Sequence, residues 1–282
     1  MVIQYICKLR GGSQPFLALA SDQLRYVVKF ANNLQGPNLP FNEAMGNELY
    51  TECGLSVPSW KALSVTDSFL DRNPDCWIQT PKGRLRPNSG LCFSSHFLGD
   101  DGKPLLEILP GTSFQRIRDP EAFWLAWLID ACAVHTDGRQ AIFEEEADGW
   151  LVAYFVDHGH MFNGPYGNEH AKFQKSRYLD QRVYPRLSSL QLVSVRKIAG
   201  ALDTDRLWRR LAALPNDWKI DSAIDQFAQC LNRLTTSSLV RNVLDTMADC
   251  QERAIESAGR KLQDRRIPTR SVLRLGVQCA GD

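Results

Sequence analysis

Two short segments, each of which ends an apolar run with an Asp close to a His and a Gly, most constrain what this chain can fold into. The first is AVHTDGRQAIF at residues 133–143, and the second is FVDHGHMF at residues 155–162. The turn sequence at residues 147–149, Ala-Asp-Gly, predicts a β-hairpin between them. Neighbouring loops at its base would then deliver Asp137 and Asp157. Such a pair of carboxylates is the layout that phosphoryl transfer requires, one for the acceptor hydroxyl and one for a metal.

A glycine pair near the start of the chain fits the same chemistry. The sequence LRGGSQPFLAL places Gly11, Gly12 and Ser13 between two strand-like runs, at residues 5–7 and 16–20. Glycines between paired strands let the backbone come close to phosphates, and the Ser13 hydroxyl can donate a hydrogen bond there. The competing interpretation is an ordinary hairpin turn, which is a common place for two glycines.

A lysine in an apolar strand is a third feature that fits phosphoryl transfer. Lys29 ends the run YVVK, where an unpaired ammonium would be costly, so we expect an anionic partner. Glu43 is our candidate, at the start of a predicted helix over residues 42–53 that ends before Gly54. Glu48 and Glu52 are alternative partners, and Lys29 could instead extend from an edge strand into solvent.

These pieces, in this order, resemble the HipA-like kinase family, a bacterial branch of the protein-kinase-like fold. The matching sequences are GGSQP, YVVKF, the run from NE to GLSVP, the TD of HTDGRQ, and VDHG followed by Phe162. Leu214-Pro215 and Trp218, before a long helical region, look like the usual ending of the family. The resemblance implies an α+β, bilobed fold. Residues 1–98 would form a small, mostly β N-lobe with one helix, and residues 99–282 a larger helical C-lobe.

The resemblance also implies a reaction and roles for the residues. The chain would bind ATP with Mg²⁺ between the lobes and transfer the γ-phosphate to a Ser or Thr hydroxyl. Lys29, held by Glu43, would contact the α- and β-phosphates, and the glycine loop (Gly11, Gly12 and Ser13) would cover them. Asp157 would bind Mg²⁺, and Asp137 would act as catalytic base or align the acceptor. Ser13 is also a candidate for autophosphorylation.

The loop after Asp137 departs from the kinase pattern. Kinases of this fold usually carry an Asn a few residues after this Asp, where it holds a second metal. Here the following residues are Gly138, Arg139, Gln140, Ala141 and Ile142. Gln140 could supply an amide oxygen to the metal, and Arg139 could lie near the transferring phosphate. His135 stands where the family commonly has another Asn.

Two alternative functions follow. The altered loop supports a pseudokinase, which is a nucleotide-binding interaction module without turnover. A phosphotransferase that acts on a cationic small molecule, as the aminoglycoside kinases do, would find acidic residues in Glu144, Glu145 and Glu146. The acceptor, a protein or a small molecule, stays unidentified. A metal site built from His135, His158 and His160 is a further alternative that we consider weaker, because an HxH in one loop is more often structural.

Composition limits the other classes of function. With 282 residues, 44% of them hydrophobic, the chain can bury a large core. A net charge of +1 argues against bulk attraction to nucleic acid, although the basic stretch at residues 252–270 leaves a patch for RNA or an acidic partner open. We expect no signal peptide, no membrane span and a cytoplasmic protein. The eight cysteines include no CxxC pair, so we expect buried thiols rather than a zinc site or disulfides.

Several elements follow from local patterns. Residues 93–97 are a candidate hinge between the lobes. Asp119-Pro120-Glu121 predicts the start of a deeply buried helix, EAFWLAWLIDACAV, whose Trp124 and Trp127 belong to the core. Residues 173–264 are predicted to be helical, with breaks near Asp203 and Pro215.

Overall fold

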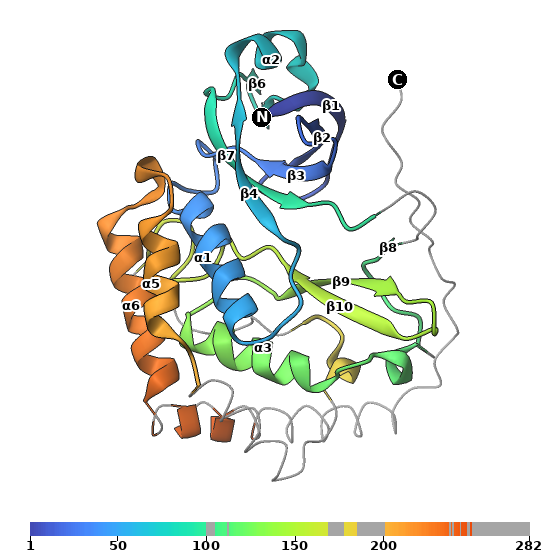
Figure 1. Ribbon diagram of the computed structural model, residues 1–282, viewed down its shortest axis with the longest axis vertical. Helices are drawn as coiled ribbons and strands as arrows, with labels where there is room; N and C mark the ends of the chain where they lie inside the picture. The colour runs from blue at the N-terminus through green and yellow to red at the C-terminus, as the bar shows by residue number, and fades with distance from the viewer. Residues whose placement is uncertain are drawn as a thin grey trace.

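A computed structural model describes residues 1–99, 105–111, 113–168, 178–184 and 201–236, together with single positions between 238 and 249. Its first part is a five-stranded antiparallel sheet in the order β1-β2-β3-β7-β4, at the top of Figure 1. The strands are β1 (Val2–Lys8), β2 (Phe16–Ala20), β3 (Arg25–Lys29), β4 (Trp60–Val65) and β7 (Gly90–His96). One face of this sheet packs on α2 (Asp67–Arg72), and a small hairpin of β5 (Ile78–Thr80) and β6 (Gly83–Leu85) follows.

Two details differ from the prediction for this region. A second helix, α2, is present because the Thr66 hydroxyl accepts a hydrogen bond from the Phe69 amide and caps it. Residues 93–96 lie within β7 and not in a hinge, since β7 pairs with both β3 and β4. A hinge would have to follow His96.

Helix α1 (Leu39–Glu52) connects the sheet to the rest of the molecule (Figure 1). It begins three residues earlier than predicted, because Pro40 lies in its first turn, where a missing amide hydrogen does no harm. Eleven of its residues are buried, from Leu39 to Tyr50. A helix enclosed on nearly all sides has little freedom to move, so it fixes whatever side chains it carries.

The predicted hairpin and buried helix are both confirmed. Strands β9 (Gln140–Glu145) and β10 (Leu151–Val156) pair in antiparallel register, with Gln140 opposite Val156, and β8 (Leu105–Leu106) extends this sheet. Helix α3 (Glu121–Cys132) packs beneath it and is buried from Phe123 to Cys132, both tryptophans included. The Asp119 carboxylate caps α3 by accepting hydrogen bonds from the amides of its first turn.

Helices α5 (Thr204–Ala212) and α6 (Asp221–Thr235) stand together beside α1 (Figure 1). Asp203 caps α5, and Pro215 starts the short turn that separates the two helices, so both predicted breaks are confirmed. The rest of the predicted helical region at residues 173–264, and the basic stretch at residues 252–270, lie mostly outside the described residues.

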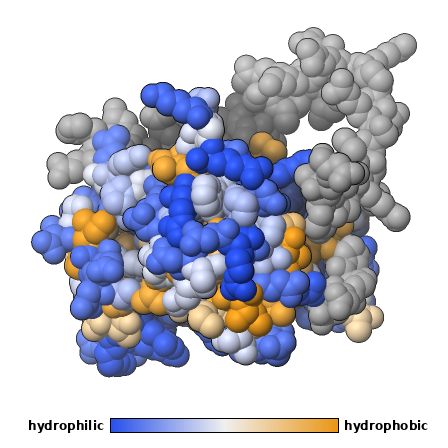
Figure 2. Space-filling view, turned by 90° about the horizontal axis from the view of Figure 1, so that it is seen from above, coloured by the Kyte–Doolittle hydropathy of each residue, from blue (hydrophilic) through white to orange (hydrophobic). Residues whose placement is uncertain are grey.

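The core confirms the α+β class and the prediction for the cysteines. The six described cysteines (Cys7, Cys53, Cys76, Cys92, Cys132 and Cys230) are buried and unbridged; Cys250 and Cys279 lie outside the described residues. Figure 2 shows a face on which hydrophobic residues form several separate patches among hydrophilic ones. In the part of the chain that the structure describes, no helix is long and apolar enough to cross a membrane.

Candidate active site

The structure joins the predicted lysine to two carboxylates from distant parts of the chain. The Lys29 Nζ atom forms an ion pair with Glu43 of α1 and lies 2.7 Å from Asp157 Oδ1, which follows β10. The side chains of Lys29 and Glu43 are 8% and 2% exposed, whereas Asp157 is 26% exposed. Lys29 therefore does not extend into solvent, and Glu43 is its partner rather than Glu48 or Glu52.

Burial and neighbouring charges shift the pKa values of Lys29, Glu43 and Asp157 in opposite directions. Burial by itself would lower the pKa of Lys29, but Asp157 and Glu43 outweigh it and raise that pKa. Burial would raise the pKa of Asp157, yet the ammonium of Lys29 lowers it below its ordinary value. For Glu43, burial dominates and its pKa is raised. Of the two acids, the partly exposed Asp157 therefore holds its negative charge more firmly than the buried Glu43.

Helix α1 holds the loop that carries Asp157. Glu43 Oε2 accepts a hydrogen bond of 3.1 Å from the amide of His158. The Asn42 side chain donates to the carbonyls of Gly159 and Met161, at 2.9 and 2.8 Å. A Cβ atom on Gly46 would lie only 2.5 Å from the Cβ atom of His158, so the glycine allows helix and loop to touch. Sequence patterns gave no signal for these contacts, because they join segments more than 100 residues apart.

Asp157 has an unusual backbone conformation, with φ of +62°. Asp tolerates this left-handed region better than most residues, but conformations of this kind persist only where the surroundings impose them. The Gln140 amide nitrogen donates to Asp157 Oδ2 at 2.7 Å, from the first residue of the neighbouring strand β9. The hairpin thus places Gln140 beside Asp157, with the amide nitrogen rather than the amide oxygen toward the carboxylate.

The second carboxylate, Asp137, is exposed at the end of the loop after α3. Its Oδ1 atom accepts a hydrogen bond of 2.7 Å from the amide of Gly138, and its backbone carbonyl contacts the His135 ring at 2.8 Å. The amide of the preceding residue, Thr136, donates to the carbonyl of His160 in the other loop, at 3.0 Å. The two Asp-bearing loops are therefore hydrogen-bonded to each other, and the Asp137 side chain is exposed to solvent.

The glycine loop lies between β1 and β2, as predicted. Gly11 has φ of +129°, and a Cβ atom on Gly12 would lie 2.5 Å from the Gln35 side chain. Asn33 donates to the Ser13 carbonyl at 2.7 Å, and Ser13 is buried. A kinase acting on Ser13 would therefore require the loop to open.

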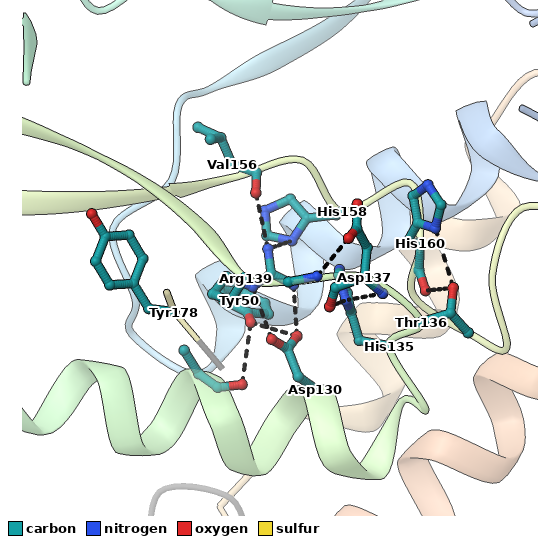
Figure 3. Close-up of polar contacts among 12 residues, drawn as sticks. Tyr50, Asp130, His135, Thr136, Asp137, Arg139, Val156, His158, His160 and Tyr178 are labelled. Atoms are coloured by element: carbon teal, nitrogen blue, oxygen red, sulfur yellow. Dashed lines mark hydrogen bonds and ion pairs between the residues drawn. The ribbon is translucent and has the colours of Figure 1, made fainter. Parts of the chain in front are cut away.

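Arg139, which the sequence suggested could lie near the transferring phosphate, is buried against α3. Its guanidinium makes a two-pronged ion pair with Asp130 of α3, with nitrogen–oxygen distances of 2.6 and 2.8 Å (Figure 3). Tyr50 of α1 donates to the same carboxylate at 2.7 Å, and its ring lies 4.9 Å from the Arg139 guanidinium. The side chains of Arg139 and Asp130 are 1% and 0% exposed. Arg139 is a buried cation that compensates the charge of Asp130 in α3.

Among the described residues, neither the histidines nor the hairpin acids form an additional site. Within the described residues, no group of three His, Cys, Asp or Glu side chains is arranged to hold a metal. Of the three hairpin acids, Glu145 and Glu146 form ion pairs with Arg116 and Arg118. These pairs lie at the turn of the hairpin, opposite the end that carries Gln140. The acidic hairpin therefore does not support a cationic acceptor site.

The residues present fit a nucleotide-bound Mg²⁺ ion. Mg²⁺ in such sites usually takes one or two carboxylates, with phosphate oxygens and water completing its shell. Asp157 has a pKa that Lys29 lowers below its ordinary value, its side chain is partly exposed, and the Gln140 amide is beside it. Lys29 is within reach of the same carboxylate and offers a positive charge for a phosphate.

Comparisons with known proteins add a distant likeness. No family model and no curated protein sequence matches the chain. Two solved structures of the Golgi casein kinase are similar in shape, with TM-scores of 0.48 and 0.46 at 11% and 12% sequence identity. Each similarity covers 88% of this chain and 74% of the other, and the second structure was solved with Mn and ADP bound. At this level the likeness assigns neither a family nor an activity.

Proposed function

We propose that this chain is an ATP- and Mg²⁺-dependent phosphotransferase of the protein-kinase-like type, similar to the HipA-like kinases. The observation that carries the proposal is Lys29, which ends strand β3 and contacts both Glu43 of α1 and Asp157 after β10. Protein kinases require a strand lysine paired with a helix glutamate and an aspartate that holds Mg²⁺. A merely structural ion pair has no need of a third, partly exposed acid.

The other residues complete the proposed site. Gly11, Gly12 and Ser13 cover the phosphates of ATP, and Lys29 contacts them. Asp157 holds Mg²⁺, with Gln140 as a second ligand through its amide oxygen after rotation of the amide group. Mg²⁺ supplies neutralisation of the phosphate charge when it is bound. Asp137 accepts the proton of the acceptor hydroxyl or aligns it. The acceptor is a Ser or Thr hydroxyl of a protein, or a small-molecule hydroxyl.

Thermal unfolding with ATP, with and without Mg²⁺, tests this proposal. A ligand that binds only the folded state raises the midpoint by mass action, by about 2.7 kcal/mol of stabilisation at 100 times its dissociation constant. We expect a Mg²⁺-dependent rise that Asp157→Ala abolishes. An exposed aspartate in a surface ion pair, Asp75, supplies the matched control: Asp75→Ala should respond to ATP as the wild type does. No rise for the wild type at millimolar ATP would refute the proposal.

A nucleotide-binding interaction module is the second candidate, and two observations favour it. No Asn follows Asp137 within its loop, and the Gln140 amide presents its nitrogen, not its oxygen, to Asp157. Loss of the γ-phosphate from ATP separates the two candidates. Mg²⁺-dependent stabilisation without any release or transfer of phosphate, in the presence of protein and small-molecule acceptors, would favour the interaction module.

A further inference from the structure

Arg139 holds both neighbours of Asp157 in place. Its Nη1 atom donates to the carbonyl of Val156 at 2.9 Å and lies 3.3 Å from Nδ1 of His158 (Figure 3). These two residues flank Asp157, whose backbone is in the left-handed region. The Arg139 side chain thus contacts the chain on each side of a residue that is held in the left-handed region.

Residues of two helices hold the Arg139 guanidinium in place. Asp130 of α3 accepts two hydrogen bonds from the guanidinium, at 2.6 and 2.8 Å. Tyr50 of α1 donates to the same carboxylate, and its ring lies 4.6 Å from that of His158. The planar fork of Arg139 therefore joins α1 and α3 to the loop through fixed directions, which a lysine could not reproduce.

We propose that Arg139, supported by Asp130, is a positioning residue that sets the conformation of Asp157 for a divalent cation, and that it does not contact the phosphate. The proposal rests on the proposed function, because it assigns the cation to Asp157. Two consecutive residues support it: Gln140 donates to the Asp157 carboxylate, and Arg139 holds the flanking backbone. Residues that orient a metal ligand in this way typically change metal affinity 10- to 100-fold when they are replaced.

Two variants separate positioning from simple loss of folding. Arg139→Lys keeps the positive charge but loses the fork. The double variant Asp130→Asn/Arg139→Met removes both charges and so leaves no buried ion without a partner, while Asn can still accept from Tyr50. Arg84→Met is the matched control, because Arg84 is an exposed arginine that pairs with Asp75 far along the chain from the site.

Amide hydrogen exchange of the nucleotide-free protein is the first measurement. We expect residues 156–161 to exchange at least about tenfold faster in both variants, while α6 (Asp221–Thr235) exchanges as in the wild type. Faster exchange everywhere to the same degree would show a purely structural role, and unchanged exchange at residues 156–161 would show no role. Either result overturns the proposal.

The Mg²⁺ concentration that gives half of the ATP-dependent thermal shift is the second measurement. It should rise about tenfold or more in both variants, with Mg²⁺-free nucleotide binding unchanged and Arg84→Met like the wild type. An unchanged Mg²⁺ requirement would overturn the proposal for the cation. If the wild type showed no ATP response while exchange at residues 156–161 still changed, Arg139 would remain the residue that positions Asp157, and the proposed function would fail instead.

Discussion

At the scale of single residues, Lys29 is the side chain on which the others depend. It faces one fully buried acid, Glu43, and one partly exposed acid, Asp157. Removal of one partner from a buried ion pair typically costs about 3–5 kcal/mol, because the other charge is left without compensation. We therefore expect Lys29→Met to destabilise the protein by roughly this amount at neutral pH. Lys61→Met is the control, since Lys61 pairs with Asp22 at the surface and its loss should change little.

The destabilisation by Lys29→Met should depend on pH, with a definite sign. In the wild type Lys29 lowers the pKa of Asp157, so the stability from that contact is present above the ordinary pKa of Asp and is lost only in acid. Burial acts to raise the pKa of both carboxyls and Lys29 opposes it, so in Lys29→Met we expect the pKa of Asp157 to rise above its unfolded value and that of Glu43, already raised, to rise further. Such groups lose folded-state stability as the pH rises. The difference between variant and wild type in the midpoint of thermal unfolding should therefore be larger at about pH 8 than at about pH 5. An equal difference at both pH values would contradict this account.

Some of these residue contacts could be predicted from the sequence. For others the sequence held a signal that the prediction did not use. Lys29 ends an apolar strand, so a buried partner could be expected from the cost of an unpaired ammonium. Asp130 is the same kind of signal, an acid in the otherwise apolar helix EAFWLAWLIDAC, and it calls for a buried cation. That argument predicts a buried cation as the partner of Asp130, and the structure shows that this cation is Arg139. Tyr50 and Asn42 gave no such signal, because their partners are set by tertiary packing.

At the scale of elements, the contact between α1 and the Asp157 loop determines the site. Gly46 lies at the closest approach, where an added Cβ atom would meet His158 at 2.5 Å and the Met161 sulfur at 2.7 Å. Gly46→Ala improves helix propensity by about 1 kcal/mol, but forcing an extra methyl group into a packed interface costs about 1–3 kcal/mol. We expect a net loss of stability together with a weaker ATP-dependent thermal shift.

Thr51→Ala in the same helix is the control for Gly46→Ala. Thr51 is exposed, so its replacement should leave stability and the ATP response close to those of the wild type. Thermal unfolding with and without ATP and Mg²⁺ measures both effects. A Gly46→Ala protein that is more stable than the wild type and responds fully to ATP would show that helix and loop can separate without harm to the site.

Elements with strong local signals were predicted well, and those without were not. The hairpin of β9 and β10 and the cap of α3 follow from turn and capping residues that act over a few positions. The start of α1 was misplaced because the buried Leu39-Pro40-Phe41 turn reads as part of a loop in the sequence. Strand β7 looked like a hinge because its pairing with β3 and β4 spans up to 70 residues of chain.

At the scale of the whole molecule, the buried side chains form two clusters. The smaller joins β1, β2 and β3 to α2, with Phe16 and Phe69 at its centre. The larger joins α1, α3, the β9–β10 hairpin and α6. Lys29 belongs to a strand of the first cluster, whereas its partners Glu43 and Asp157 are attached to the second. The candidate site thus lies across the boundary between two cores. Because α1 precedes residue 98 but belongs to the larger core, this boundary differs from the predicted division of the chain at residue 98. We expect the two cores to open independently of each other.

Phe69→Ala tests that independence. Removal of a buried Phe typically costs about 3–5 kcal/mol, and regions with separate cores can open separately. We expect amides of β1 and β2 to exchange faster in Phe69→Ala, while those of α3 and α6 keep their wild-type rates. The matched variant in the larger cluster, Phe123→Ala, should instead accelerate exchange in α3 and α1. Equal acceleration of all these elements by Phe69→Ala would show one cooperative core.

ATP with Mg²⁺ should reduce the difference in exchange rate between the two clusters in Phe69→Ala. A ligand that contacts Lys29 and Asp157 together stabilises only the state in which both clusters are closed.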